Sequence, residues 1–237
     1  MKLDNATVLI TGANRGLGLA FAREALARGA RKVYAGARDP ASITLPGVEP
    51  IRLDVTRSED VAAAARHCSD VTLLINNAGI AVTGGFLAEG SIDSARAQLD
   101  TNFFGPLRLS QAFAPVLAAH GGGAILNVLS VASWINSPLL AMYGASKSAA
   151  WALTNGLRHE LRAQHTQVLG MHVGFVDTDL TRGFDVPKST PEEVVRRTFD
   201  ALEAGAEEVL VDERTRQVKQ GLSAEPGVYL RDPRTLA

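Results

Sequence analysis

Short apolar runs alternate with longer amphipathic segments along the whole chain. Runs rich in Val, Ile and Leu predict strands, whereas segments with apolar residues at helical spacing predict helices. The predicted strands are 7–10, 32–37, 48–55, 71–76, 124–130, 167–173 and 208–211. The predicted helices are 17–28, 56–68, 92–120, 142–163 and 190–205. This alternation is typical of an α/β fold with a parallel sheet covered by helices on both faces.

Proline and capping residues refine these boundaries. Pro50 predicts that the third strand pairs only beyond it, because proline has no amide to donate. Residues 56–59 have the spacing of a capping box, and residues 190–193 repeat that spacing with proline at the first helical position. Pro106 and Pro115 are expected to interrupt the long helix.

A glycine-rich run, Thr11-Gly12-Ala13-Asn14-Arg15-Gly16-Leu17-Gly18, follows the first predicted strand and opens the first predicted helix. Glycine is needed where a turn takes unusual dihedral angles and where the backbone approaches a pyrophosphate closely. The spacing Gly-x-x-x-Gly-x-Gly differs from the common Gly-x-Gly-x-x-Gly fingerprint. Taken alone, the run fits either a nucleotide-binding loop or a simple glycine-rich turn.

A second group of polar residues suits proton transfer. Tyr143 and Lys147 stand four residues apart on one predicted helix, so they share a face, and Ser130 precedes the tyrosine by thirteen residues. An ammonium about 4 Å from the phenol is worth about 4 kcal/mol at an effective dielectric near 20. That interaction predicts a tyrosine pKa lowered from about 10 toward neutrality. Ser130 is then placed to hold a carbonyl oxygen while Tyr143 exchanges a proton with it.

Together, the glycine run and the Ser…Tyr-x-x-x-Lys set resemble the short-chain dehydrogenase/reductase family. The resemblance implies a Rossmann-like, doubly wound three-layer αβα sandwich with a seven-stranded parallel sheet. It also implies one NADP(H)-binding domain over residues 1–237, with the substrate pocket built from loops 131–142 and 174–190. The expected reaction is hydride transfer between the cofactor and a carbonyl or alcohol carbon.

Further motifs match this family in order along the chain. Asp54-Val55 follows the third strand, where the family places a carboxylate on the adenine ring, and Asn76-Asn77-Ala78-Gly79 matches its adenine-pocket motif. Asn102 falls where the family has a fourth catalytic member, which positions a water leading to Lys147. Gly174–Thr178 matches the segment at the nicotinamide end. One departure is Val173, because the family usually has proline before this glycine.

The resemblance assigns site residues position by position. The expected catalytic residues are Asn102, Ser130, Tyr143 and Lys147. The expected cofactor-binding residues are Gly12, Asn14, Arg15, Gly16, Leu17, Gly18, Arg38, Asp54, Val55, Asn76, Ala78, Gly79, Tyr143, Lys147, Gly174, Val176 and Thr178. The expected substrate-binding residues are Ser130, Trp134, Leu140, Tyr143, Phe175 and Phe184.

The end of the second strand predicts the form of the cofactor. At Ala37 the NAD-using relatives usually carry an aspartate for the ribose diol, and alanine cannot accept those hydrogen bonds. Arg38 and Arg15 are suited to a 2′-phosphate instead, so NADPH/NADP+ is expected. Asp39 is the residue that would take the carboxylate role if the backbone shifted.

The loop between the serine and the tyrosine predicts the class of substrate. Residues 131–142 are mostly apolar and contain no Arg or Lys, and Trp134 is assigned to the pocket rather than to the core. The charged segment 212–216 is interpreted as a solvated face. We therefore expect a small, largely apolar ketone, aldehyde or secondary alcohol as the substrate.

Composition and charge exclude several other functions. The formal net charge of −1 provides no basic field for nucleic acid or an anionic membrane. The single cysteine, Cys68, permits no intrachain disulfide, and no signal peptide or membrane span is evident, so the cytoplasm is the expected compartment. The five histidines lack metal-ligand spacing, so no metal is expected.

Two further expectations complete the interpretation. The alternative function is a dinucleotide-binding redox sensor without turnover, which would not need the proton-transfer set. The helix that carries Tyr143 has a smooth face at Ala149, Ala152, Leu153 and Gly156 that suits packing against a second copy. The chain after residue 211 lacks the family's Asp-Gly-Gly, which builds a second interface in tetramers. A homodimer is therefore expected.

Overall fold

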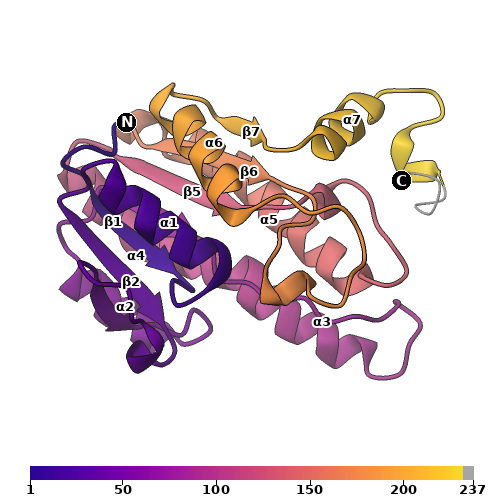
Figure 1. The fold of residues 1–237 in the computed structure, drawn as a ribbon, viewed down its shortest axis with the longest axis horizontal. Coiled ribbons are helices and arrows are strands. Elements are labelled where there is room, and N and C mark those ends of the chain that lie inside the picture. Colours follow the sequence, from indigo (N-terminus) through magenta and orange to yellow (C-terminus); the bar gives the residue numbers. More distant parts are fainter. Residues whose placement is uncertain (232–237) are drawn as a thin grey trace.

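A seven-stranded, all-parallel sheet forms the centre of the computed structural model, which describes residues 1–231 (Figure 1). The strand order is β3-β2-β1-β4-β5-β6-β7. The strands are β1 Thr7–Thr11, β2 Lys32–Ala37, β3 Glu49–Arg52, β4 Leu73–Asn76, β5 Ala124–Val128, β6 Gln167–His172 and β7 Glu208–Leu210. The order reverses between β1 and β4, and open α/β sheets bind ligands at the carboxyl ends of strands beside such a point.

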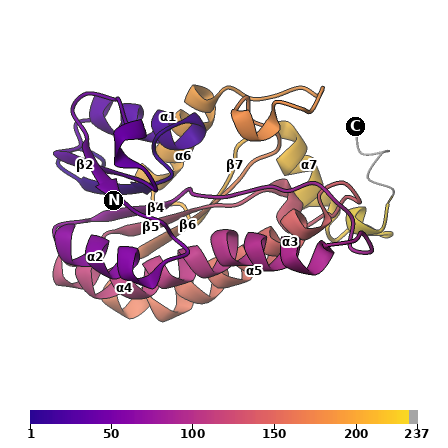
Figure 2. The same ribbon diagram turned by 90° about the horizontal axis from the view of Figure 1, so that it is seen from below.

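Helices cover both faces of this sheet. They are α1 Gly16–Ala27, α2 Ser58–His67, α3 Ser91–Leu99, α4 Gly105–Ala119, α5 Ala141–Glu160, α6 Pro191–Glu203 and α7 Glu213–Gly221. Figure 2 shows α1 and α6 on one side and α2, α4 and α5 on the other. The central strands serve both layers: Val8 and Ile10 pack in the α1/α6 core, whereas Leu9 between them packs in the opposite core. The predicted doubly wound three-layer fold is confirmed.

Two boundary predictions around β3 are wrong. Pro50 lies within the strand and pairs in register with Ala35, and the ladder already begins at Glu49. The strand tolerates proline because it lies at the edge of the sheet, where the missing amide has no partner to lose. Thr56 does not cap α2, because its hydroxyl donates instead to Asp54 Oδ1, 2.7 Å away.

The predicted long helix contains a π-helical segment, Asp100–Phe104, which joins α3 to α4. Pro106 stands just after it, which agrees with the predicted interruption, because proline removes an amide from the helical ladder. By contrast, α4 continues through Pro115 without a break. The wide turn carries Asn102 inward, to an exposure of 1%. Such π segments are frequent at functional sites.

The segment predicted to be a solvated face begins helix α7 instead. Asp212 caps that helix by accepting the amide of Thr215 at 2.8 Å, and Thr215 itself is fully buried. Figure 1 shows α7 leaving the end of β7. The charges of this segment are therefore fixed in place on the fold.

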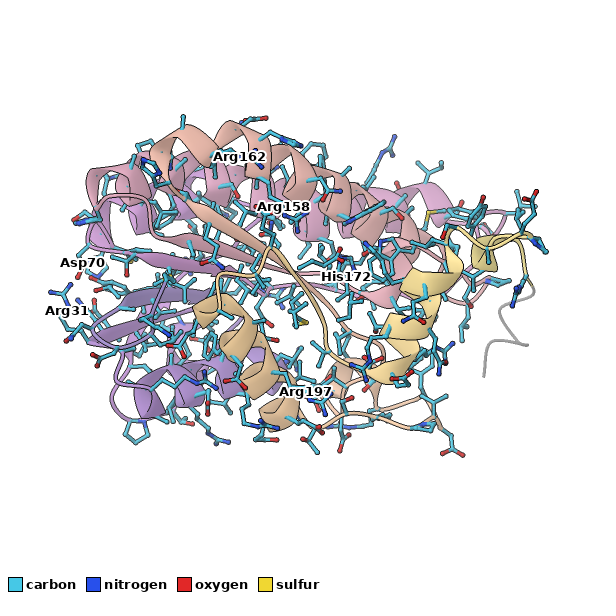
Figure 3. The ribbon with its side chains drawn as sticks, turned by 90° about the horizontal axis from the view of Figure 1, so that it is seen from above. Arg31, Asp70, Arg158, Arg162, His172 and Arg197 are labelled. Atoms are coloured by element: carbon cyan, nitrogen blue, oxygen red, sulfur yellow. The ribbon has the colours of Figure 1, made fainter. Side chains whose placement is uncertain are left out.

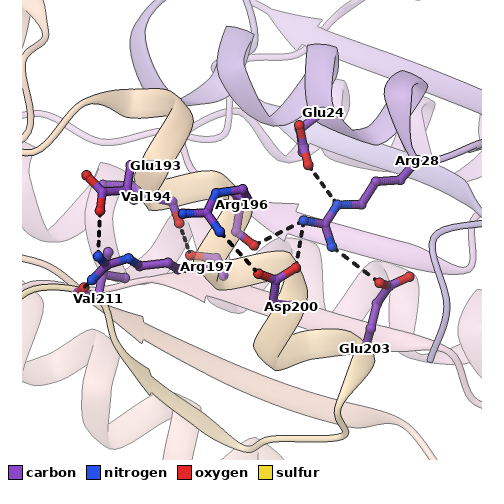
Figure 4. Close-up of polar contacts among 10 residues, drawn as sticks. Glu24, Arg28, Glu193, Val194, Arg196, Arg197, Asp200, Glu203 and Val211 are labelled. Atoms are coloured by element: carbon purple, nitrogen blue, oxygen red, sulfur yellow. Dashed lines mark hydrogen bonds and ion pairs between the residues drawn. The ribbon is translucent and has the colours of Figure 1, made fainter.

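A partly buried arginine at the C-terminal end of α1 joins that helix to α6. Arg28 contacts Glu24 at 2.8 Å, Asp200 at 2.8 Å and Glu203 at 3.2 Å (Figure 4). Burial alone would lower the pKa of the Arg28 guanidinium, but hydrogen bonds and charges from Glu24 and Asp200 raise it. The network holds the two helices on this face together.

No helix within residues 1–231 combines the length and the apolar character needed to cross a bilayer.

Candidate active site

The glycine-rich run forms a tight loop from β1 into α1. Gly12 and Gly16 take φ values of 65° and 53°, a region that other residues rarely adopt. Helix α1 has Arg15 at its N-cap without a side-chain hydrogen bond, and its first turn contains no acidic residue. Its first amides are therefore left for an outside acceptor, as a bound phosphate requires. The loop fits the pyrophosphate of a dinucleotide.

Gly18 and Asn77 fix the shape of this loop from behind. A Cβ on Gly18 would lie 2.1 Å from the carbonyl oxygen of Gly12 and 2.7 Å from Asn77 Nδ2. That Asn77 nitrogen donates to the carbonyl oxygens of Thr11 at 2.8 Å and Gly12 at 3.2 Å. Gly18 was expected to contact the cofactor, but it lines neither cavity of the site. Its place is at the close contact between helix and loop.

A cavity of about 730 Å³ extends from this loop along the carboxyl ends of the strands. Fifteen of the seventeen expected cofactor residues line it, all except Gly18 and Asn76. The fifteen are Gly12, Asn14, Arg15, Gly16, Leu17, Arg38, Asp54, Val55, Ala78, Gly79, Tyr143, Lys147, Gly174, Val176 and Thr178. Residues not predicted also line it, among them Asn77, Ile80 and Thr101. These residues follow predicted strands or lie beside Asn102, and that position in the sequence could have indicated that they line the cavity.

Asn76 has a role inside the fold. Its side-chain amide donates to Asn127 Oδ1 at 2.8 Å, and Asn127 donates in turn to Thr154 Oγ1 at 2.9 Å. This buried chain connects β4, β5 and α5. Asn76 thus positions the elements around the site and does not face the cavity.

One end of the cavity is built from the ends of β2 and β3. Ala37, Arg38 and Asp39 line it, and the Asp39 carboxylate accepts the amide of Ala41 at 3.1 Å. Asp54, just after β3, also lines this cavity. Burial alone would raise the pKa of the Asp54 carboxyl, but hydrogen bonds from Thr56 and the charges of Arg38 and Arg57 lower it. This end therefore combines an ionised carboxylate with arginine.

Ser130, Tyr143 and Lys147 meet at the other end. Ser130 follows β5 and starts a 3₁₀ turn at Val131–Ser133, with its Oγ accepting the amide of Ala132 at 3.1 Å. Tyr143 lies in the first turn of α5 and Lys147 in the next. The Lys147 ammonium is buried and donates to the carbonyl oxygen of Val128 at 2.9 Å. Strand end and helix start thus bring the predicted triad together.

The pKa of Tyr143 differs from the value that the sequence predicts. Burial raises the pKa of the Tyr143 phenol above its usual range, and a side-chain hydrogen bond with Ser130 only partly opposes this effect. Burial also lowers the pKa of Lys147 to about 8. The Lys147 ammonium lies 5.7 Å from the centre of the Tyr143 ring. The predicted lowering of the tyrosine pKa by lysine is not found, because burial raises this pKa and only the hydrogen bond with Ser130 lowers it.

Asn102 lies behind this triad and lines neither cavity. Its Oδ1 accepts the amide of Ile80, and its Nδ2 donates to the Ile80 carbonyl oxygen and to Ser146 Oγ, each at 2.9 Å. A Cβ on Gly79 would lie 3.2 Å from Asn102 Oδ1 and 3.7 Å from Lys147 Nζ, so both groups border that glycine. Asn102 therefore fixes the Ile80 segment beside the lysine.

A second cavity, of about 880 Å³, opens beside the first. Its walls come mainly from residues 131–140 and 174–186, and they include the expected residues Leu140, Phe175 and Phe184. The rings of Phe175 and Phe184 pack with centroids 5.3 Å apart. Ser130 and Tyr143 line both cavities, so the two cavities meet at the proton-transfer group.

Trp134 does not line this cavity, contrary to the expectation. Its ring is stacked on the His172 imidazole, with centroids 3.9 Å apart, and meets Trp151 edge-on. His172, labelled in Figure 3, comes from β6, and its Nδ1 lies 3.2 Å from the carbonyl oxygen of Ser130. Burial lowers the pKa of His172 to about 3, so this imidazole is neutral and serves as packing beneath the serine. Within residues 1–231, no cluster of His, Cys, Asp or Glu has the arrangement of a metal site.

Comparison with known proteins agrees with this geometry. The family model for short chain dehydrogenases matches residues 6–187. An uncharacterized oxidoreductase of Schizosaccharomyces pombe is 36% identical over 168 residues, which cover 68% of this chain and 57% of the relative. Dehydrogenase/reductase SDR family member 7B of Bos taurus is 32% identical over 195 residues, which cover 75% of this chain and 60% of the relative. The chain thus spans less than two-thirds of the length of these two relatives.

A solved short chain dehydrogenase from Burkholderia cenocepacia, in complex with NADP, is 39% identical to this chain. The match covers 95% of this chain and 96% of the other, with a TM-score of 0.91. A Burkholderia phymatum structure in complex with NAD, 24% identical with a TM-score of 0.83, shares the fold. The chain belongs to the short-chain dehydrogenase family.

Proposed function

We propose that this oxidoreductase is an NADP(H)-dependent carbonyl reductase or alcohol dehydrogenase acting on a small, largely apolar ketone, aldehyde or secondary alcohol. The observation that best supports this function is that Ser130 and Tyr143 line both cavities. A dinucleotide along the strand ends and a carbonyl compound in the apolar cavity would therefore meet at one hydroxyl pair. When bound, the nicotinamide supplies or accepts a hydride.

The chain's own residues supply the proton and the orientation. In the reducing direction, the Tyr143 hydroxyl donates its proton to the carbonyl oxygen, and the Ser130 hydroxyl donates a hydrogen bond to the same oxygen. Lys147 and Asn102 support these two hydroxyl groups without exchanging the proton themselves. The buried ammonium of Lys147 favours negative charge on Tyr143 after the proton has left. Asn102 fixes the backbone beside that lysine through Ile80.

Two arginines in the cofactor cavity, and the absence of a carboxylate at Ala37, support NADP(H) as the cofactor. Arg38 and Arg15 line the cofactor cavity, and Ala37 at the end of β2 offers no acceptor for a ribose diol. Asp39 caps the 3₁₀ turn that follows β2, with one carboxylate oxygen accepting the amide of Ala41. Family membership does not choose the cofactor, because solved members hold NADP or NAD. The choice therefore rests on these side chains.

We expect kcat/KM for NADPH to exceed that for NADH by about tenfold or more, because a guanidinium pairs strongly with a phosphate. Arg38→Ala is expected to remove most of this preference, since its charge is lost while the alanine beside it still offers no diol acceptor. Initial rates of cofactor oxidation with cyclohexanone, acetophenone and benzaldehyde measure both values. Arg66→Leu, which removes an exposed cation from the last turn of α2 that lines neither cavity, is the control. Equal or better use of NADH by the unmodified protein would refute the proposal.

The pH dependence follows from the two buried groups. Because burial raises the pKa of Tyr143, the phenol stays protonated through neutral pH, as carbonyl reduction requires. Lys147 loses its charge as the pH rises through about 8. We therefore expect kcat/KM for reduction to be level near neutrality and to fall above about pH 8, and alcohol oxidation to increase with pH. Rate profiles in both directions check this, and reduction that accelerates steadily into alkaline solution would contradict the assignment.

We further propose that the protein is a homodimer that packs through the outer face of α5. Gly156 has no atom within 4 Å of a Cβ position, so a second helix has room to approach closely there. Phe104, beside this layer, is 43% exposed. Light scattering at micromolar concentration is expected to give twice the mass of the chain. The mass of one chain or of four would contradict the dimer.

A further inference from the structure

One cation reaches the substrate cavity, and it comes from a distant part of the chain. Arg214 lies in the first turn of α7 and lines the cavity together with Tyr143, Phe175 and Phe184. Among the residues that line this cavity, Arg214 alone carries a charge. It does not line the cofactor cavity, so its guanidinium serves the substrate side and not the dinucleotide.

Neighbouring carboxylates do not neutralise Arg214. Asp212 accepts the amide and hydroxyl of Thr215 and the amide of Gly174, and Glu213 pairs with Arg216 at 2.9 Å. Within residues 1–231, Arg214 makes no ion pair, and its buried Nε has no hydrogen-bond partner. A buried donor without a partner is costly, because it has lost water and gained nothing. Within the described residues no group accepts a hydrogen bond from the Arg214 guanidinium, so the N–H groups that face the cavity are left for an acceptor that a ligand brings.

Hydrogen bonds hold the first turn of α7, which carries Arg214, against the rest of the fold. Asp212 caps α7 and, with its other oxygen, accepts the amide of Gly174 at 2.6 Å. Gly174 itself lines both cavities. The start of α7 is therefore tied to the loop that carries Phe175, which keeps the backbone of Arg214 beside the apolar wall.

We propose that Arg214 binds a carboxylate on the substrate, at the end remote from the reacting carbonyl. A guanidinium presents paired donors that match a carboxylate, and a cavity with apolar walls strengthens that pairing. The substrate class is thus an oxo acid, or the corresponding hydroxy acid, with an apolar body between its carbonyl and its carboxylate. The inference rests on the proposed function and adds the second recognition point.

The test uses pairs of compounds that differ only in charge. Benzoylalkanoates with two to four methylenes between the ketone and the carboxylate are compared with their methyl esters, using NADPH and the full-length protein. At the best chain length, kcat/KM for the acid is expected to exceed that for the ester by about tenfold or more. In Arg214→Leu this ratio falls to near one, and Arg214→Lys retains part of it. In the Arg66→Leu control, which removes an exposed cation from the last turn of α2, the ratio is unchanged.

Two outcomes separate the inference from the function on which it rests. Turnover of the esters and neutral ketones, with no acid preference or one that survives in Arg214→Leu, overturns the inference and leaves the carbonyl reductase standing. If no carbonyl compound is reduced, the proposed function fails, and calorimetric titration of 4-benzoylbutanoate still decides the role of Arg214. Binding that weakens about tenfold in Arg214→Leu supports it. Equal binding by the two proteins, or no binding by either, overturns it.

Discussion

Replacing Tyr143 by phenylalanine is expected to lower kcat by about 100- to 10,000-fold, the range that a positioned general acid contributes. The variant loses only the hydroxyl group of a residue that lines both cavities. The ring, the helix and the Lys147 bond to Val128 do not depend on that oxygen. Cofactor affinity is therefore expected to stay within about threefold of the unmodified value, because the loss falls on the transition state. Steady-state rates at saturating NADPH, together with fluorescence titration of NADPH, separate the two quantities.

Tyr229→Phe provides a matched control, because that tyrosine is 57% exposed and lines neither cavity. It removes the same atom from the same residue type and is expected to leave kcat unchanged. If Tyr143→Phe turned over at a rate near that of the control, the proton donor would be another group. If it lost cofactor affinity and kcat together, Tyr143 would act mainly as a cofactor contact.

The second large effect is expected from Gly18→Ala. An alanine Cβ would lie 2.1 Å from the Gly12 carbonyl oxygen, so the loop or the helix must move. Overpacking of this kind costs about 1–3 kcal/mol of stability. Because the displaced atoms belong to the phosphate-binding loop, the Kd for NADPH should rise about ten- to hundredfold. Urea unfolding and fluorescence titration measure the two effects.

Gly183→Ala is the comparison, because a Cβ there meets no atom within 4 Å. It should change both stability and cofactor affinity little. A Gly18→Ala protein that bound NADPH as tightly as the Gly183→Ala protein would show that the loop and α1 can separate without loss.

The sequence predicted the parts of the fold that follow from local pattern. Strands such as β1 read as β-branched apolar runs, and the helix starting at Thr190 and Pro191 carried its own cap, which the structure confirms. Helix α7 was missed because its sequence is almost entirely polar. It is held by burial of Thr215 and Val218 and by the Asp212 cap, none of which appears as an apolar stripe.

The site shows the same division between local and long-range information. Ser130, Tyr143 and Lys147 follow from motif spacing, and the structure brings them together. The packing of Trp134 on His172 joins residues far apart in the chain, so no local pattern distinguished it from a pocket residue. The approach of Arg214 to residues 131–140 has the same origin. The raised pKa of Tyr143 depends on burial, which the spacing to Lys147 does not report.

The proposed reaction is hydride transfer to a carbonyl carbon with protonation by Tyr143. The most direct test is reduction of acetophenone with NADPH carrying deuterium at C4 of the nicotinamide, once in each of the two stereochemical positions. Mass spectrometry of the alcohol reports where the label goes. We expect one deuterium on the carbinol carbon from one of the two cofactors, and almost no product with Tyr143→Phe. Failure to form the alcohol, or alcohol without deuterium from either cofactor, would contradict it.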